Sequence, residues 1–158
     1  LSLRDEAWSC YEEALALLDG HPELAEARAD LLGIRAQWLR GLGYGHALPA
    51  LEDALRAQRA LGDEPRLALA EALTWLSWAR VRDGDPRGAT SGAVEAQRML
   101  DRLALPQHEL HGVLASLRGV TASLEHRAQA AADAFHEAGL RFERGRDGCL
   151  PVYPRTRL

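Results

Sequence analysis

His108 and His111, which flank Glu109, are the side chains best placed for metal chemistry. Histidines three residues apart share one face of a helix, so their rings could approach a single ion. The zinc-protease pattern is H-E-x-x-H, however, and this segment is one residue short of it. We therefore expect no metal site here, and we interpret both histidines as solvated or hydrogen-bonded residues.

The sequence lacks the residues needed for a catalytic nucleophile or a phosphate-binding loop. Cys10 has no basic neighbour to lower its pKa, and Cys149 lies at the other end of the chain without a C-x-x-C pair. All 19 basic residues are arginine, so the lysine of a P-loop or a Schiff base is missing. The glycine-rich segment 41–45 has no such lysine and is better explained as a flexible turn. We predict a protein that is not an enzyme and uses no cofactor.

The charge and hydropathy of the sequence argue against nucleic acid and membranes as binding partners. Acidic residues stand beside arginines at helical spacing, as Asp53 does with Arg56, which is typical of a solvated face. A net charge of −4 creates no broad positive field, so we expect no direct contact with nucleic acid. Apolar runs are too short to cross a membrane, and no signal peptide pattern opens the chain. A cytoplasmic protein is expected.

Helix breakers recur about every 21 residues, at Gly20, Gly41, Gly62 and Gly84 and then near Pro106 and His126. The intervening segments are rich in Ala, Leu, Arg and Glu, with apolar residues at the spacing of an amphipathic helix. Capping residues and first-turn prolines stand where these segments begin. The pattern predicts an all-α protein with seven helices, over 2–19, 22–40, 46–61, 64–83, 86–103, 107–124 and 126–144. Pro49 fits only in the first turn of its helix.

Short turns between helices of this length require antiparallel hairpins. Alternate helices share a signature of small residues at about 40-residue intervals, which indicates that the hairpins repeat. We expect Ala47, Ala54, Ala89 and Ala96 at helix crossings that admit no larger side chain. The signature positions are Ala7, Tyr11 and Ala14; Ala47, Leu51 and Ala54; Ala89, Ala93 and Ala96; and Ala128, Ala132 and Phe135.

The segment from Ala70 to Met99 resembles the tetratricopeptide repeat family. It contains the sequence A-E-A-L-x-x-L-S, a Gly84-Asp85 turn and then A-x-x-x-A-x-x-A, which match the first helix, turn and second helix of that family. The period is longer than the usual 34 residues, as in sensor regions of large bacterial transcriptional regulators. The resemblance implies a right-handed superhelix of stacked hairpins over residues 1–145, followed by an extended tail over 146–158.

In the register of that family, the first helices of the hairpins line a concave groove that binds a peptide or protein segment. The groove would be an apolar trough with two arginines, suited to an amphipathic helix or apolar strand with an acidic residue. The inner positions are Leu32, Ala36, Leu39, Arg40, Glu71, Thr74, Trp78, Val81, Arg82, Val113, Leu117 and Val120. We expect partner contacts from Leu32, Ala36, Arg40, Thr74, Trp78, Arg82, Val113 and Leu117.

Other functions stay open at this point. The chain could be a regulatory segment whose groove senses a small molecule, or an element that only drives oligomerisation. Trp75 and Trp78 could also fill gaps left by alanines rather than bind a partner. Neither terminal helix has the polar cap that a repeat protein needs, so we expect self-association through a terminal helix. Sequence beyond either end would distinguish a regulator from an isolated scaffold.

Overall fold

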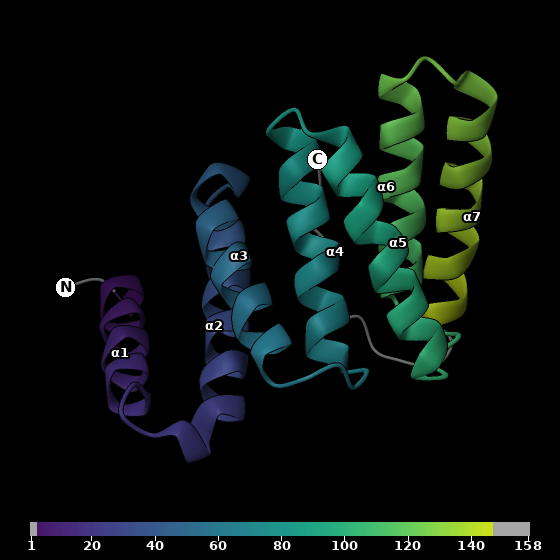
Figure 1. The fold of residues 1–158 in the computed structure, drawn as a ribbon. Helices are drawn as coiled ribbons and strands as arrows, with labels where there is room; N and C mark the ends of the chain where they lie inside the picture. The colour runs from purple at the N-terminus through teal and green to yellow at the C-terminus, as the bar shows by residue number, and fades with distance from the viewer. Residues whose placement is uncertain (1–2, 147–158) are drawn as a thin grey trace.

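The computed structural model describes residues 3–146, and in this part of the chain every regular element is a helix (Figure 1). The predicted tail over 146–158, with Cys149, falls outside the described residues except for Arg146, which ends the last helix. The seven predicted helices are all present. The elements are α1 (Leu3–Leu18), a 3-10 turn (Pro22–Leu24), α2 (Ala25–Arg40), α3 (Tyr44–Ala60), α4 (Leu67–Arg82), α5 (Pro86–Arg102), α6 (Leu110–Leu124) and α7 (Ala128–Arg146).

Helix ends use the local chemistry that the sequence indicated. Asp85 caps α5, because its Oδ1 accepts a hydrogen bond from the Gly88 amide at 2.8 Å. Gly62 and Gly84 adopt positive φ angles of 110° and 87° in the turns after α3 and α4. Ala104 and His126 adopt left-handed conformations, at φ 54° and 57°, without a glycine. These two turns are the places where the glycine spacing gave the weakest prediction.

Three helices begin three residues later than predicted. Residues 22–24 form a 3-10 turn before α2, and α4 and α6 are delayed to the same extent. Pro65 explains the delay of α4, because a proline disfavours helical backbone in the residue before it. Arg66 is then extended, with φ −133° and ψ 141°. The prediction for Pro49 is also wrong, since α3 starts at Tyr44 and places this proline in its second turn.

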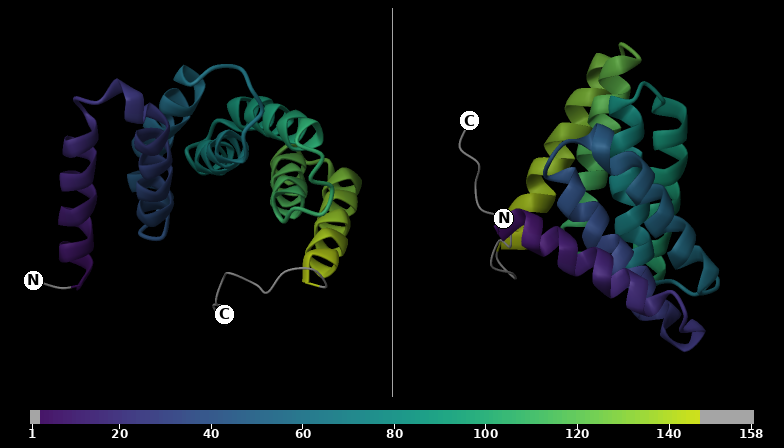
Figure 2. Two further views of the ribbon diagram at one scale, coloured as in Figure 1. Left: turned by 90° about the horizontal axis from the view of Figure 1, so that it is seen from below. Right: turned by 90° about the vertical axis from the view of Figure 1, so that its left-hand side faces the viewer.

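Consecutive helices pack in pairs, α2 with α3, α4 with α5 and α6 with α7, and α4 also contacts α2, α3 and α6. Figure 2 shows the helices following a curve, with α4 and α6 toward its inner side and α5 toward its outer side. We call the side formed by α2, α4 and α6 the inner face. At the start of the row, α1 packs on α2 through Trp8 and Trp38, whose stacked rings have centroids 5.3 Å apart.

Buried alanines allow the close crossings inside each pair. Ala47, Ala54, Ala89 and Ala96 are all 0% exposed, as the small-residue signature predicted. The register proposed for the last helix is wrong, because Ala128, Ala132 and Phe135 are exposed. The buried alanines of α7 are instead Ala131 and Ala138, so the two crossing positions recur every 42 residues. Among residues 3–146, no helix has the length and apolar character needed to span a membrane.

Candidate functional site

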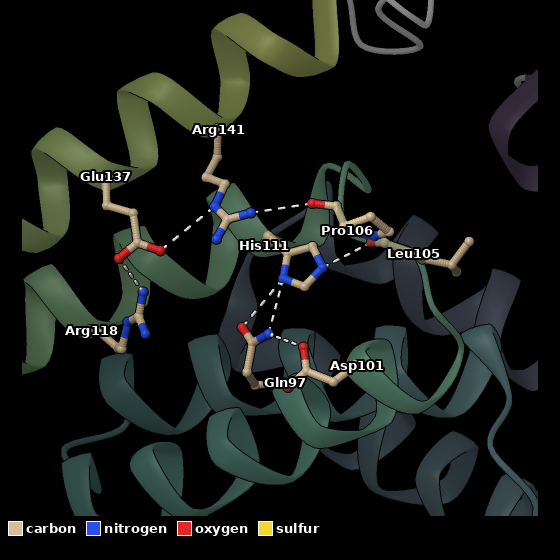
Figure 3. Close-up of polar contacts among 8 residues, drawn as sticks. All are labelled: Gln97, Asp101, Leu105, Pro106, His111, Arg118, Glu137 and Arg141. Atoms are coloured by element: carbon tan, nitrogen blue, oxygen red, sulfur yellow. Dashed lines mark hydrogen bonds and ion pairs between the residues drawn. The ribbon is translucent and has the colours of Figure 1, made fainter.

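His111 has a structural role that occupies both of its ring nitrogens (Figure 3). The ring is 5% exposed, and its Nε2 lies 2.9 Å from the carbonyl oxygen of Leu105, to which it donates. Its Nδ1 lies 3.0 Å from Nε2 of Gln97, which also donates to Asp101. Burial lowers the pKa of His108; the proximity of His111 lowers it further, and that of Glu109 opposes the shift. In the described part of the chain, no three metal-binding side chains come together.

The same region fastens α7 to the rest of the row (Figure 3). Arg141 donates to the carbonyl oxygen of Pro106 at 3.2 Å, and its Nε lies 3.6 Å from Glu137. Glu137 also pairs with Arg118 of α6 at 2.7 Å. These polar contacts hold the connection between α5 and α6 against α7, so we assign this cluster to stability.

The predicted groove residues fall at different depths. Four of them are buried in the core and cannot contact a partner directly: Leu32, Ala36, Thr74 and Leu117. Three are half-buried, and Arg82 alone is exposed. The half-buried ones are Arg40, Trp78 and Val113. Of the wider set, Val81 is buried, and Leu39, Glu71 and Val120 are half-buried. The first helices therefore use much of the predicted surface to pack against their own hairpins.

Arg40 makes contacts that the prediction did not include, and the tryptophans fit the alternative in which they fill gaps in the packing. The Arg40 guanidinium lies over the ring of Trp75, 3.8 Å from its centroid, and its Nε donates to Gln37 at 3.0 Å. Trp75 thus has an arginine against its face, and both Trp75 and Trp78 pack against the core. The buried Nε1 of Trp78 has no hydrogen-bond partner among the described residues. Arg40 is consequently already engaged and is less free to bind an acidic partner.

A cleft of about 360 Å³ opens between α2 and α4, with α3 as its floor. Sequence reasoning did not find it, because three helices from two hairpins must come together to form it. We call it the α2–α4 cleft. Its lining is mainly apolar, and Ile34 on its wall is 52% exposed. Lining residues are Asp30, Gly33, Ile34, Gln37, Leu51, Ala54, Gln58, Leu67, Ala68, Glu71 and Ala72.

Carboxylates give this cleft a negative edge. Burial raises the pKa of Glu71, and the nearby charges of Glu109 and Asp30 raise it further. Asp30 accepts a hydrogen bond from Nε2 of Gln58 at 3.0 Å. Within residues 3–146, no ion pair with an arginine or histidine neutralises any of these three acids. The edge therefore carries carboxylates that form no ion pair with the described part of the protein.

A larger cleft, of about 550 Å³, lies between α1, α2 and α3. Its charged lining is internally paired: Arg28 with Asp19 at 2.7 Å, Arg35 with Glu12 at 3.1 Å, and Arg56 with Asp53 at 3.0 Å. A ligand there would compete with existing ion pairs. The α2–α4 cleft, with its apolar lining and its acids outside any ion pair, is the better candidate for a binding site.

Known proteins offer no guide to this site. No family model matches the chain, no curated protein matches it, and no solved structure does so. The resemblance to tetratricopeptide repeats remains a prediction that rests on residues 70–99.

Proposed function

We propose that this protein is an interaction scaffold that binds a peptide or protein segment on its inner face, as tetratricopeptide repeats do. The observation that carries the proposal is the α2–α4 cleft, where an exposed Ile34 stands beside open space between two helices. Exposed apolar side chains at the edge of a cleft are typical anchors for a partner's side chain. The stacked hairpins would form the superhelix implied by that resemblance.

The inner face also has two ends of different charge. Asp30 and Glu71 lie near the starts of α2 and α4, whereas Arg40 and Arg82 are their last residues. Asp30 and Arg40 are ten positions apart, which is about 15 Å along a helix. A segment that crosses this face from helix to helix would therefore have acidic residues on one side of it and basic residues on the other.

Two alternatives are each supported by one observation. The α2–α4 cleft has a volume at the lower limit of small-molecule sites, so a ligand-sensing segment of a larger bacterial regulatory protein is the second candidate. Self-association is the third, because α7 carries the exposed apolar residues Phe135, Leu140 and Phe142. None of the three functions requires a cofactor or contact with nucleic acid or membrane. We expect the scaffold to act in the cytoplasm.

Gly33 allows the scaffold proposal to be tested without disturbing the core. It lines the cleft, and a Cβ at this position would meet no atom within 4 Å. Gly33→Leu should therefore fill the cleft and also favour the helix. Gly139→Leu is the matched control, because Gly139 lies on the exposed side of α7 with equally open surroundings.

The measurement is selection of short peptides from a random displayed library on the folded protein. Peptides that bind the unmodified protein and Gly139→Leu, but not Gly33→Leu, would support the proposal. A library that yields no peptide sensitive to Gly33→Leu would contradict it. Binding of small metabolites with the same sensitivity would favour the sensing alternative.

A further inference from the structure

Two acids that line the α2–α4 cleft, and a third acid close to it, come from successive helices of the inner face. Asp30 belongs to α2, Glu71 belongs to α4, and Glu109 directly precedes α6. The charges of Glu109 and Asp30 both raise the pKa of Glu71, so all three carboxylates contribute negative potential at this side of the cleft. This potential runs across the helices, in the direction that an extended segment would follow over the inner face.

A second, separate feature lies in the floor of the same cleft. Gln58 lines the cleft but is only 1% exposed, and its Nε2 is bound to Asp30. Its Oε1 is buried and has no hydrogen-bond partner among the described residues. A buried acceptor without a donor is unfavourable. A donor that entered the cleft, and moved the Asp30 and Gln58 side chains slightly apart, would satisfy it.

Two arginines on the helices that line the cleft are already engaged by other groups. Arg40 is held by Gln37 and by the face of Trp75. Arg66, at the start of α4, donates to the backbone carbonyl oxygens of Gln58 and Gly62 at 2.7 and 2.8 Å. Neither arginine forms an ion pair with the three acids. The unpaired carboxylates would therefore be matched by cations from the partner.

We propose that the α2–α4 cleft binds a basic segment of a partner protein, with a lysine or arginine between Asp30, Glu71 and Glu109 and an apolar side chain beside Ile34. The proposal rests on the scaffold function proposed above and adds the chemistry of the partner. It reverses the expectation from sequence of an acidic partner, because Arg40, which was expected to meet that partner, is engaged by Gln37 and Trp75. A cation beside the half-buried Glu71 would offset the repulsion that Glu109 and Asp30 exert on its carboxylate.

The test uses three synthetic peptide libraries that share one central apolar residue and differ only in the flanking residues. The flanks are lysine and arginine in the first library, glutamine in the second, and aspartate and glutamate in the third. Fluorescence anisotropy of selected peptides should show the basic set binding about tenfold more tightly than the neutral set at low salt. The preference should shrink as salt increases.

Two triple variants separate local charge from net charge. Asp30→Asn, Glu71→Gln and Glu109→Gln together neutralise the three acids at and near the cleft, and the carboxamide oxygen introduced by Asp30→Asn can still accept from Gln58. The control is Glu52→Gln, Glu64→Gln and Glu143→Gln, which neutralises three exposed acids elsewhere. Only the first variant should lose the basic preference. Equal loss in both variants would show a non-specific charge effect and would overturn the inference.

The outcomes also separate this inference from the scaffold function. Peptides that depend on Gly33 but bind equally well with neutral or acidic flanks would leave the scaffold standing and overturn the basic specificity. If no library binds in a way sensitive to Gly33→Leu, both proposals fail. If Gly33→Leu instead converts a dimer into a monomer in sedimentation, the cleft is occupied by a second copy and the basic-partner inference is wrong.

Discussion

Ser77 of α4 occupies the space that a side chain at Gly92 of α5 would need. A Cβ atom on Gly92 would overlap the hydroxyl oxygen of Ser77 but would lie 3.7 Å from the Ser77 Cβ, an ordinary contact distance. The hydroxyl is held in place, because Ser77 is buried and its Oγ donates to the carbonyl oxygen of Leu73 at 2.7 Å. The two helices can therefore approach this closely because the Ser77 hydroxyl lies against a glycine, which has no side chain.

This relationship predicts a strong coupling between the two positions. Gly92→Ala should cost about 1–3 kcal/mol from overpacking, partly offset by about 1 kcal/mol of helix propensity. In the Ser77→Ala background, the same change should be neutral or stabilising. Urea unfolding of both single variants and the double variant measures the coupling. Strictly additive effects would mean that the two side chains do not meet.

The buried alanines predict a contrast between two identical substitutions. Ala89 is 0% exposed at the crossing of α4 and α5, so Ala89→Leu should lower the free energy of unfolding by about 1–3 kcal/mol. Ala132 is exposed on α7, and Ala132→Leu should change stability by less than about 0.5 kcal/mol. Thermal unfolding compares the two. Equal melting temperatures for both variants would contradict the packing register described here.

Replacing Glu71 by glutamine should stabilise the protein in a pH-dependent way. The pKa of Glu71 is raised in the folded state, so folding favours the protonated carboxyl and the ionised form destabilises the protein at neutral pH. Glu71→Gln should therefore stabilise at pH 7, by less than about 1 kcal/mol because solvent screens this half-buried group. The gain should vanish as the pH falls through the raised pKa toward the ordinary value of 4.5. Glu52→Gln, on an exposed surface, should show no comparable gain.

Self-association through a terminal helix is the fourth prediction. Leu140 of α7 is 41% exposed and Leu17 of α1 is 74% exposed. Burying several hundred Å² of such apolar surface would contribute about 25 cal/mol per Å². Sedimentation at increasing concentration should show a dimer or larger assembly, which Leu140→Glu or Leu17→Glu dissolves. A protein that stays monomeric at high concentration with both helices ordered would exclude this interface.

Helix number and order were predictable, because glycine turns and the apolar period act locally. Predicted helix starts were wrong where a proline lay near the start of a helix. Pro65 postponed the start of α4, and Pro49 was accommodated in the second turn of α3. The buried alanines of α7 were predicted wrongly for a different reason. Alanine is so frequent in this helix that several registers fit the small-residue signature. Only packing against α6 selects Ala131 and Ala138.

The candidate site was harder to predict than the fold. Successive residues of a helix differ by about 100° in direction, so a small error in rotation moves a residue from groove to core. Thr74 illustrates this, because it was expected in the groove but is buried, with its hydroxyl bound to the carbonyl oxygen of Ala70. The cluster of Asp30, Glu71 and Glu109 could not be inferred at all, since it depends on how α2, α4 and α6 lie against one another.

The 42-residue interval between buried alanines also bears on how this chain could change length. Ala47, Ala89 and Ala131 occupy equivalent places in successive hairpins, as do Ala54, Ala96 and Ala138. A duplication or deletion of 42 residues would bring together helices whose buried alanines still lie at matching positions. Gene-level insertions of that size would therefore preserve the crossings, whereas insertions of other sizes within a helix would rotate them out of register. Each added hairpin would also bring a new surface free to diverge.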